Sequence, residues 1–163
     1  MDAFRAGQDA KSEEAARELM QLVDGARAQF GDLLDWRDEG GALWKRAKES
    51  TGADDKAGEL TDAIAQHAYR KHWGHTVLGL LACRCGELDT AVSHLIASAD
   101  VRPDYRLSSY GPSLDLLREI CLRGRWEDGL EYLGRWETVW NDPRLREWIA
   151  AVNERRLPGA DPE

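Results

Sequence analysis

Apolar residues recur every three or four positions along most of the chain, which is the spacing of one face of an α-helix. In the N-terminal third this pattern starts after Ser12, a residue suited to a helix N-cap, and continues to about Trp36. The apolar positions of this stripe are Ala16, Leu19, Val23, Ala26, Phe30 and Leu33. Strand-like alternation is nearly absent. We therefore expect an all-α protein with a first long helix over residues 12–36, preceded by a frayed segment at 1–11.

Glycine and proline residues divide the rest of the chain into further helices. After Gly40-Gly41 the pattern predicts a short helix over "ALWKRAKE" and then a helix from about Asp55 into "YRKHWGH", which Gly74 either breaks or bends. Pro112 and Pro143 stand where a first helical residue suits proline. The remaining helices are expected at roughly 75–85, 88–100, 112–123, 126–140 and 143–155, and the tail over 156–163 is expected to be flexible.

The stretch from residue 72 to residue 103 carries the most specific pattern. With residue 72 as the first position of a 34-residue unit, six residues occupy positions that a tetratricopeptide repeat favours: Leu78, Gly79, Gly86, Ala91, Leu95 and Pro103. The stretch therefore resembles such a repeat. It departs from the pattern at His75, Ala82 and Ser98, where the family prefers tryptophan, tyrosine and alanine.

A second copy follows 38 residues later, with an irregular closing proline at Pro143. It pairs Leu78 with Leu116, Cys83 with Cys121, Gly86 with Gly124, Asp89 with Glu127, Ala91 with Gly129, and Leu95 with Leu133. We expect the small residues at 86, 91, 124 and 129 to let paired helices approach closely, while leucines fill the seam. The alternative is a generic helical bundle in which this spacing arises by chance.

This interpretation gives one domain over residues 1–163. N-terminal helices at 12–70 would cover two repeats at 72–141, and the helix at 143–155 would close the array. Residues 72–155 are also similar to small bacterial helical repeat proteins of unassigned function, through the combination "GHTVLG…HL…SSYGP…W".

Composition narrows the range of functions. Thirty acidic residues against 22 Lys and Arg give a net charge of −8, which argues against a nucleic-acid partner. No apolar run approaches the roughly 18–20 residues of a membrane span, and the N-terminus has no apolar signal core. The three cysteines do not form a secreted disulfide framework. We therefore expect a cytoplasmic protein without membrane contact.

If the repeats stack, the starts of their first helices should lie side by side. That would bring "KHWGHT" (71–76) close to "LSSYGP" (107–112), where two helix N-termini could hold a carboxylate, a phosphate or a peptide end. The side chains around this place would be His72, Trp73, His75, Thr76, Ser108, Ser109 and Tyr110. The alternative is that the aromatic residues pack under the N-terminal helices and the serines cap a helix.

The resemblance also implies a peptide groove along the first helix of each repeat. Its positions fall on Trp73, Thr76, Leu80, Cys83 and Arg84 in the first copy, and on Gly111, Leu114, Arg118, Cys121 and Leu122 in the second. The lysine and asparagine of the co-chaperone carboxylate clamp are missing from these positions. We expect Trp73 and Tyr110 to supply apolar contacts, His75, Thr76 and Ser109 to supply hydrogen bonds, and Arg84 and Arg118 to attract acidic groups.

Other chemistry receives less support. His72 and His75 share a helical face and could chelate a metal, but no acidic third ligand accompanies them. Cys83 and Cys121 are either buried thiols or a reactive pair. No nucleophile motif, phosphate loop or dinucleotide fingerprint is present, so the chain is expected to be neither an enzyme nor a cofactor protein.

Three kinds of partner remain open. A protein or peptide in the groove is the first expectation. The seven tryptophans are expected to be packing residues, and the alternative is an aromatic pocket for a small molecule. The stripe of the 12–36 helix should cover the repeats as a cap, or else pair with a second copy as a homodimer.

Overall fold

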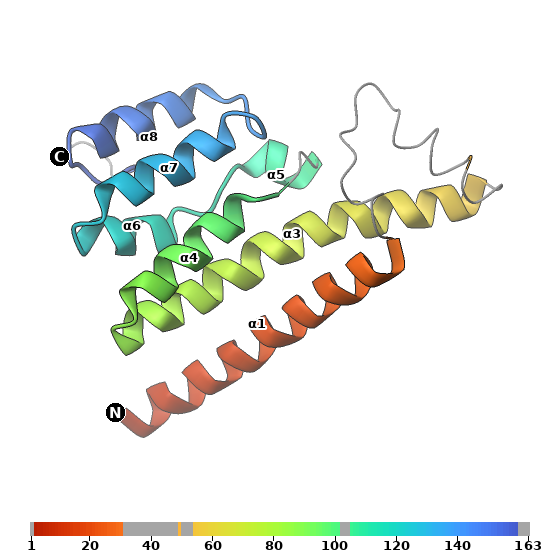
Figure 1. The fold of residues 1–163 in the computed structure, drawn as a ribbon, viewed down its shortest axis with the longest axis horizontal. Helices are drawn as coiled ribbons and strands as arrows, with labels where there is room; N and C mark the ends of the chain where they lie inside the picture. Colours follow the sequence, from red (N-terminus) through yellow and green to blue (C-terminus); the bar gives the residue numbers. More distant parts are fainter. Residues whose placement is uncertain (1, 31–48, 50–53, 102–104, 160–163) are drawn as a thin grey trace.

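The computed structural model describes residues 2–30, 49, 54–101 and 105–159 (Figure 1). Within these residues the chain forms helices and no strand, so the all-α expectation is confirmed. The helices are α1 (Asp2–Phe30), α3 (Asp54–Cys85), α4 (Leu88–Ala99), α5 (Tyr105–Tyr110), α6 (Asp115–Leu122), α7 (Trp126–Trp136) and α8 (Pro143–Asn153).

Two helices are longer than the sequence pattern predicts. Helix α1 begins at Asp2, so the frayed start and the N-cap at Ser12 are wrong. Helix α3 continues through Gly74 as a single helix of 32 residues, so a break there is wrong. Gly74 lies against α1, where an added Cβ would meet Met20 Sδ at 3.0 Å. The absence of a side chain at Gly74 therefore allows α1 and α3 to pack closely. The break at Gly40-Gly41, the helix at 42–49 except Glu49, and Trp36 and Trp44 lie outside the described residues.

The boundaries in the second half differ at three places, one of which is the end of α7 at Trp136, four residues before the expected end at 140. The segment expected as a loop before Pro112 contains the short helix α5, and α6 begins at Asp115 after Leu114, so Pro112 is not a first helical residue. Pro143 does begin α8, where the Asp142 carboxylate accepts a hydrogen bond from the Arg144 N–H. That prediction is confirmed, and it follows from a proline and a capping residue in sequence.

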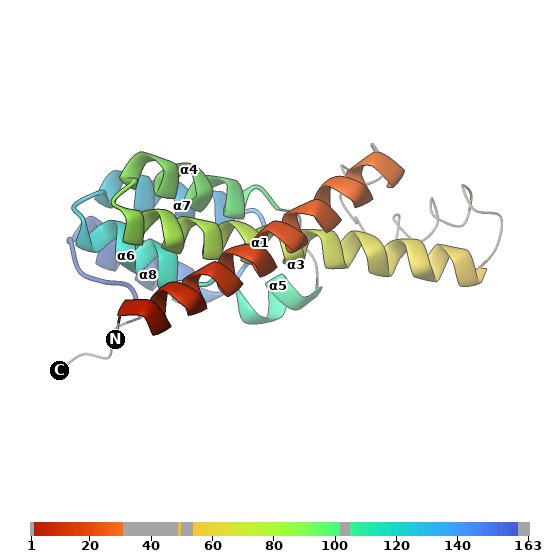
Figure 2. The same ribbon diagram turned by 90° about the horizontal axis from the view of Figure 1, so that it is seen from below.

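The helices pack as two neighbouring hairpins with one helix added at each side. Helix α4 folds back on the C-terminal half of α3, and α7 folds back on α6; α3 contacts α6, and α4 contacts α7. Helix α8 packs on α7, and α1 lies along α3 on the side away from α4 (Figures 1 and 2). The assignment of the two hairpins to the tetratricopeptide pattern stays a prediction.

The turns that end α3 and α6 have the same hydrogen bonds. After α3, the Glu87 N–H donates to the Ala82 carbonyl at 2.9 Å; after α6, the Arg125 N–H donates to the Ile120 carbonyl at 3.2 Å. Gly86 and Gly124 precede these donors with φ of +80° and +83°. This is the Schellman motif, in which a left-handed residue closes the helix. The expectation that these two glycines allow helix contact is therefore wrong, since no atom lies within 4 Å of an added Cβ.

Other small residues do hold the helices close. A Cβ on Gly79 would overlap Leu116 Cδ2 and lie 3.2 Å from His94 Cβ, so this position joins α3, α4 and α6. A Cβ on Gly129 would lie 2.9 Å from Leu117 Cδ1 and 3.0 Å from Cys121 Sγ. Ala91 and Gly129 are buried, as the sequence pattern predicts for the small positions of the second helices.

The core lies where the two hairpins and α8 meet. Trp136, Trp140 and Tyr132 are its largest fully buried side chains, with leucines from α4, α6 and α7 around them. On the other side of α3, Ala16 and Val23 of α1 are buried. These two residues of the N-terminal stripe therefore pack within the chain, where α1 contacts α3. A cap over the repeats and a homodimer through this helix both stay predictions.

Candidate binding surface

A solvent-open hollow lies between α1 and the middle of α3. It has a volume of about 240 Å³ and is lined by Leu19, Gln66, Tyr69, Arg70 and Trp73. The residues from α3 form pairs three or four positions apart, Gln66 with Tyr69 and Arg70, and both of these with Trp73, so the four share one face of the helix. The rings of Tyr69 and Trp73 lie 6.2 Å apart, and the Arg70 Nη2 donates to the Gln66 Oε1 at 2.7 Å. The hollow thus combines apolar area with a positively charged group.

Helix α5 packs next to α3 and ends in an exposed aromatic residue. Tyr110 is 81% exposed, the most exposed of the large hydrophobic side chains in the described part of the chain. Ser108 and Ser109 are also exposed, whereas Leu107 is buried. Neither Trp73 nor Tyr110 is fully buried beneath α1, so both rings retain surface for a partner.

The predicted meeting of two helix N-termini is wrong. Residues 71–76 lie inside α3, where their backbone N–H groups already serve the helix. The two segments are nevertheless neighbours, because the Ser113 N–H donates to the His72 Nε2 at 3.1 Å. The site is therefore built by side chains of a continuous helix, and no positive helix end is available at residues 71–76 for an anion.

His72 is a buried link between three parts of the fold. Its Nδ1 lies 3.0 Å from the Ser98 carbonyl oxygen of α4, and its Nε2 accepts from Ser113 before α6. These two partners require the neutral tautomer with the proton on Nδ1. Burial lowers the pKa of His72 to about 4, against the smaller raising effect of the bond to Ser98. Thr76 is also buried, and its hydroxyl donates to the His72 carbonyl. Neither side chain is oriented to bind a ligand.

His75 pairs with His94 rather than with His72. The two Nδ1 atoms lie 2.9 Å apart, so one ring donates and the other accepts. Burial lowers the pKa of His75 to about 4, with further lowering from His94 and Lys71, while Asp100 and Asp24 raise it. Burial also lowers the pKa of His94. The alternative of a metal pair at His72 and His75 has no support from this geometry, because each ring is bonded to a different partner. The described residues contain no group of three or more potential metal ligands.

The remaining groove positions of the first copy face other parts of the chain. Arg84 is exposed and forms an ion pair with Asp9 of α1, and Leu80 is partly buried against the core. Lys71 donates to both the backbone and the carboxylate of Asp100. The Arg84 guanidinium, which we expect from the sequence to attract an acidic group of a ligand, is therefore paired with Asp9 of the same chain.

Cys83 and Cys121 are buried free thiols. Burial raises the pKa of the Cys83 thiol and raises the pKa of Cys121 to about 11. A raised pKa disfavours the nucleophilic thiolate. The structure thus supports the packing interpretation of these two cysteines over the reactive one.

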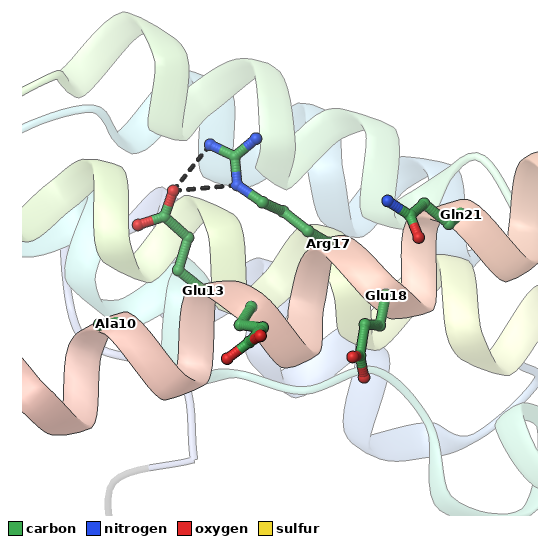
Figure 3. Close-up of a pocket in the computed structure, with 6 residues that line it drawn as sticks. Ala10, Glu13, Arg17, Glu18 and Gln21 are labelled. Atoms are coloured by element: carbon green, nitrogen blue, oxygen red, sulfur yellow. Dashed lines mark hydrogen bonds and ion pairs between the residues drawn. The ribbon is translucent and has the colours of Figure 1, made fainter.

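The outward flank of α1 is a second solvent-open surface, and it is polar. Figure 3 shows Arg17 turned toward Glu13, whose Oε1 accepts from both the Nε at 3.0 Å and the Nη2 at 2.7 Å. All its lining side chains come from one helix: Ala10, Glu13, Glu14, Arg17, Glu18 and Gln21. A single helix flank without an apolar floor is a solvated surface, so we assign no site here.

The sequence reasoning missed four of the five residues around the hollow, and it missed His94 as the partner of His75. The spacing of Gln66, Tyr69, Arg70 and Trp73 could have been read as one helix face. Leu19 could not have been placed beside Trp73 without the packing of α1 on α3.

Comparisons with protein-family models, with curated proteins and with solved structures find no match to this chain. None of the helices in the described ranges combines the length and apolar character needed to cross a bilayer.

Proposed function

We propose that this protein is a non-catalytic binding module built on a tetratricopeptide-like array of helical hairpins. It docks a peptide segment or a partner's helix on the surface around Trp73. The observation that carries the proposal is the open hollow between α1 and α3, with its two aromatic rings and the Arg70 guanidinium.

The hollow favours a partner that supplies one apolar side chain and an acidic or carbonyl group. Trp73 and Tyr69 offer rigid aromatic area, which binds with little loss of conformational entropy. Arg70 has further N–H donors beyond the one that bonds Gln66. Tyr110 on the neighbouring helix α5 extends the surface.

A peptide fits this surface better than a small molecule. The hollow is open, and its volume of about 240 Å³ lies below the roughly 300–1,000 Å³ of most small-molecule sites. A peptide needs only one such depression per anchoring side chain, because the rest of its contacts spread over the adjoining surface.

A displayed peptide library panned on the wild-type protein tests the proposal. We expect selected peptides to lose at least tenfold in affinity, measured by titration calorimetry, with Trp73→Ala and with Arg70→Ala. Arg135→Ala is the matched control for Arg70→Ala, because Arg135 is an exposed arginine on α7 and does not line the hollow. Circular dichroism of each variant is the control for folding.

The Arg70 variant separates loss of binding from loss of folding, since within the described residues the Arg70 side chain bonds Gln66 of its own helix. Equal affinity of the selected peptides for wild type and both hollow variants, with folding intact, would remove the proposal.

A further inference from the structure

The end of the described chain is held against α6. After α8 the backbone returns so that the Arg118 Nε donates to the Pro158 carbonyl at 2.9 Å and the Nη2 donates to the Gly159 carbonyl at 2.8 Å. Pro158 is fully buried, and Leu157 packs on the core. The expected flexible tail is therefore wrong for residues 157–159. Residues 160–163 lie outside the described part.

The turn after α8 directs the chain to this place. The Arg156 N–H donates to the Ala151 carbonyl at 2.8 Å, and Arg155 adopts a left-handed φ of 55°. These are the features of the turns after α3 and α6. Because the helix is closed sharply, the next residues run back toward α6, where Arg118 bonds them.

The contacts define what kind of segment fits. One guanidinium satisfies two successive backbone carbonyls, those of the turn at Pro158 and Gly159. Proline can be buried here because it has no N–H to leave without a partner. A Cβ on Gly159 would lie 2.8 Å from Arg118 Nη2 and 3.0 Å from Leu114 Cδ1, at a φ of +64°. The surface therefore selects the order apolar, proline, glycine.

We propose that Leu114, Arg118 and Trp148 form a peptide-binding subsite, the α6 subsite, for a Leu-Pro-Gly-like segment of a partner protein that takes the same turn. Trp148 borders this place, since its Nε1 would lie 3.7 Å from a Cβ on Gly159. The chain's own Leu157–Gly159 occupies the subsite in the free protein. The partner of this subsite resembles the chain's own C-terminal segment in chemistry, and it binds when that segment leaves.

Leu157–Gly159 belongs to the same chain as the α6 subsite, so it competes for that subsite more effectively than a separate partner does. A tethered ligand competes at an effective concentration in the millimolar range. A free peptide therefore binds the α6 subsite weakly until the tether is weakened. The α6 subsite is separate from the hollow around Trp73, so an experiment can contradict binding at one surface without contradicting binding at the other.

The test uses full-length protein and a fluorescent peptide of residues 153–163. The double variant Leu157→Ser, Pro158→Ser removes the apolar anchors of the internal segment. Fluorescence anisotropy should show the peptide binding this variant at least tenfold more tightly than wild type. Adding Arg118→Ala should cancel that gain, whereas Arg135→Ala, an exposed arginine on α7, should leave it unchanged.

Gly159→Ala is a second way to release the segment, and it leaves the side chains of Leu157 and Pro158 unchanged. It should raise peptide affinity in the same direction, and a scrambled peptide should bind neither variant. If folded released variants bind the peptide no better than wild type, or if Arg118→Ala leaves the binding intact, the segment is only a structural part of the fold and the proposal is wrong.

Discussion

Arg155 takes a backbone conformation that glycine takes at the two equivalent turns. Its φ is 55°, while Gly86 and Gly124 end α3 and α6 at similar positive values. A residue with a Cβ is disfavoured in this region by about 1 kcal/mol. The side chain of Arg155 is exposed, so little packing offsets this cost.

We expect Arg155→Gly to raise the free energy of unfolding by about 0.5–1 kcal/mol, because glycine removes the left-handed strain. Gly124→Ala, its reverse at the end of α6, should lower the free energy by about 1 kcal/mol. Urea denaturation followed by circular dichroism measures both. A loss of stability in Arg155→Gly would mean that the arginine side chain has a stabilising role that exceeds the strain.

His72 makes the stability of the fold depend on pH. Its neutral ring is required by Ser98 and Ser113, and its pKa is lowered to about 4 in the fold. In the unfolded chain an ordinary histidine pKa is about 6.5. The unfolded state therefore binds the proton first, and stability is complete above about pH 6.5 and falls as the pH drops toward 4.

We expect His72 to contribute a slope of up to about 1.4 kcal/mol per pH unit in this window. The free energy of unfolding, measured by urea denaturation at steps between pH 7.5 and 4.5, should fall accordingly. His75 and His94 add to the slope in the same direction, since their pKa values are also lowered. His72→Gln is the comparison variant, and it should show a smaller slope. A histidine titration by NMR that gave His72 a pKa near 6.5 would contradict the assignment.

At the scale of one helix, Gly74 and Gly79 show what sequence reasoning can and cannot predict. Both glycines lie in α3, and either could be read as a helix breaker. The structure places one against α1 and the other between α4 and α6. Helix propensity cannot distinguish a glycine that breaks a helix from one that packs against a second helix. The reason is that the sequence of one helix does not show which helix it packs against. By contrast Pro143 predicted the start of α8, since it acts within the helix that it begins.

We expect alanine at these two positions to have different effects. At Gly79 the new Cβ would overlap Leu116 Cδ2 in the core, so Gly79→Ala should lower stability by about 1–3 kcal/mol. At Gly74 the nearest atom is Met20 Sδ on a flexible side chain, and the helix gains up to about 1 kcal/mol from alanine. Gly74→Ala should therefore be close to neutral. Thermal unfolding of the two variants side by side checks the order.

At the scale of the whole molecule, the hairpins and α8 share one core, whereas α1 packs mainly along α3 in the part of the chain that the structure describes (Figure 2). The fold class and most helix positions follow from the three-to-four-residue spacing. The hollow does not, because it depends on Leu19 meeting Trp73 across two helices that are distant in sequence. The docking of Pro158 on Arg118 is likewise a long-range contact that no local pattern contains.

Because α1 packs mainly on α3, we expect the backbone amides of α1 to exchange with solvent faster than those of α6 and α7. Native-state hydrogen exchange read by mass spectrometry should show α1 opening at a lower free energy than global unfolding. Equal protection of α1 and α7 would show that the cap and the core unfold together.

The unbroken α3 also limits how the length of this chain can change during evolution. At about 1.5 Å per residue its 32 residues span about 48 Å, and each residue turns the following side chains by about 100°. One residue inserted between Trp73 and Gly79 would rotate the face of α3 that contacts α1 by about 100° relative to the face that contacts α4 and α6. An insertion of seven residues would nearly restore the phase. Descendants of this gene should therefore differ in length within the turns and at the two ends of α3, and keep the spacing from Gln66 to Cys83 fixed.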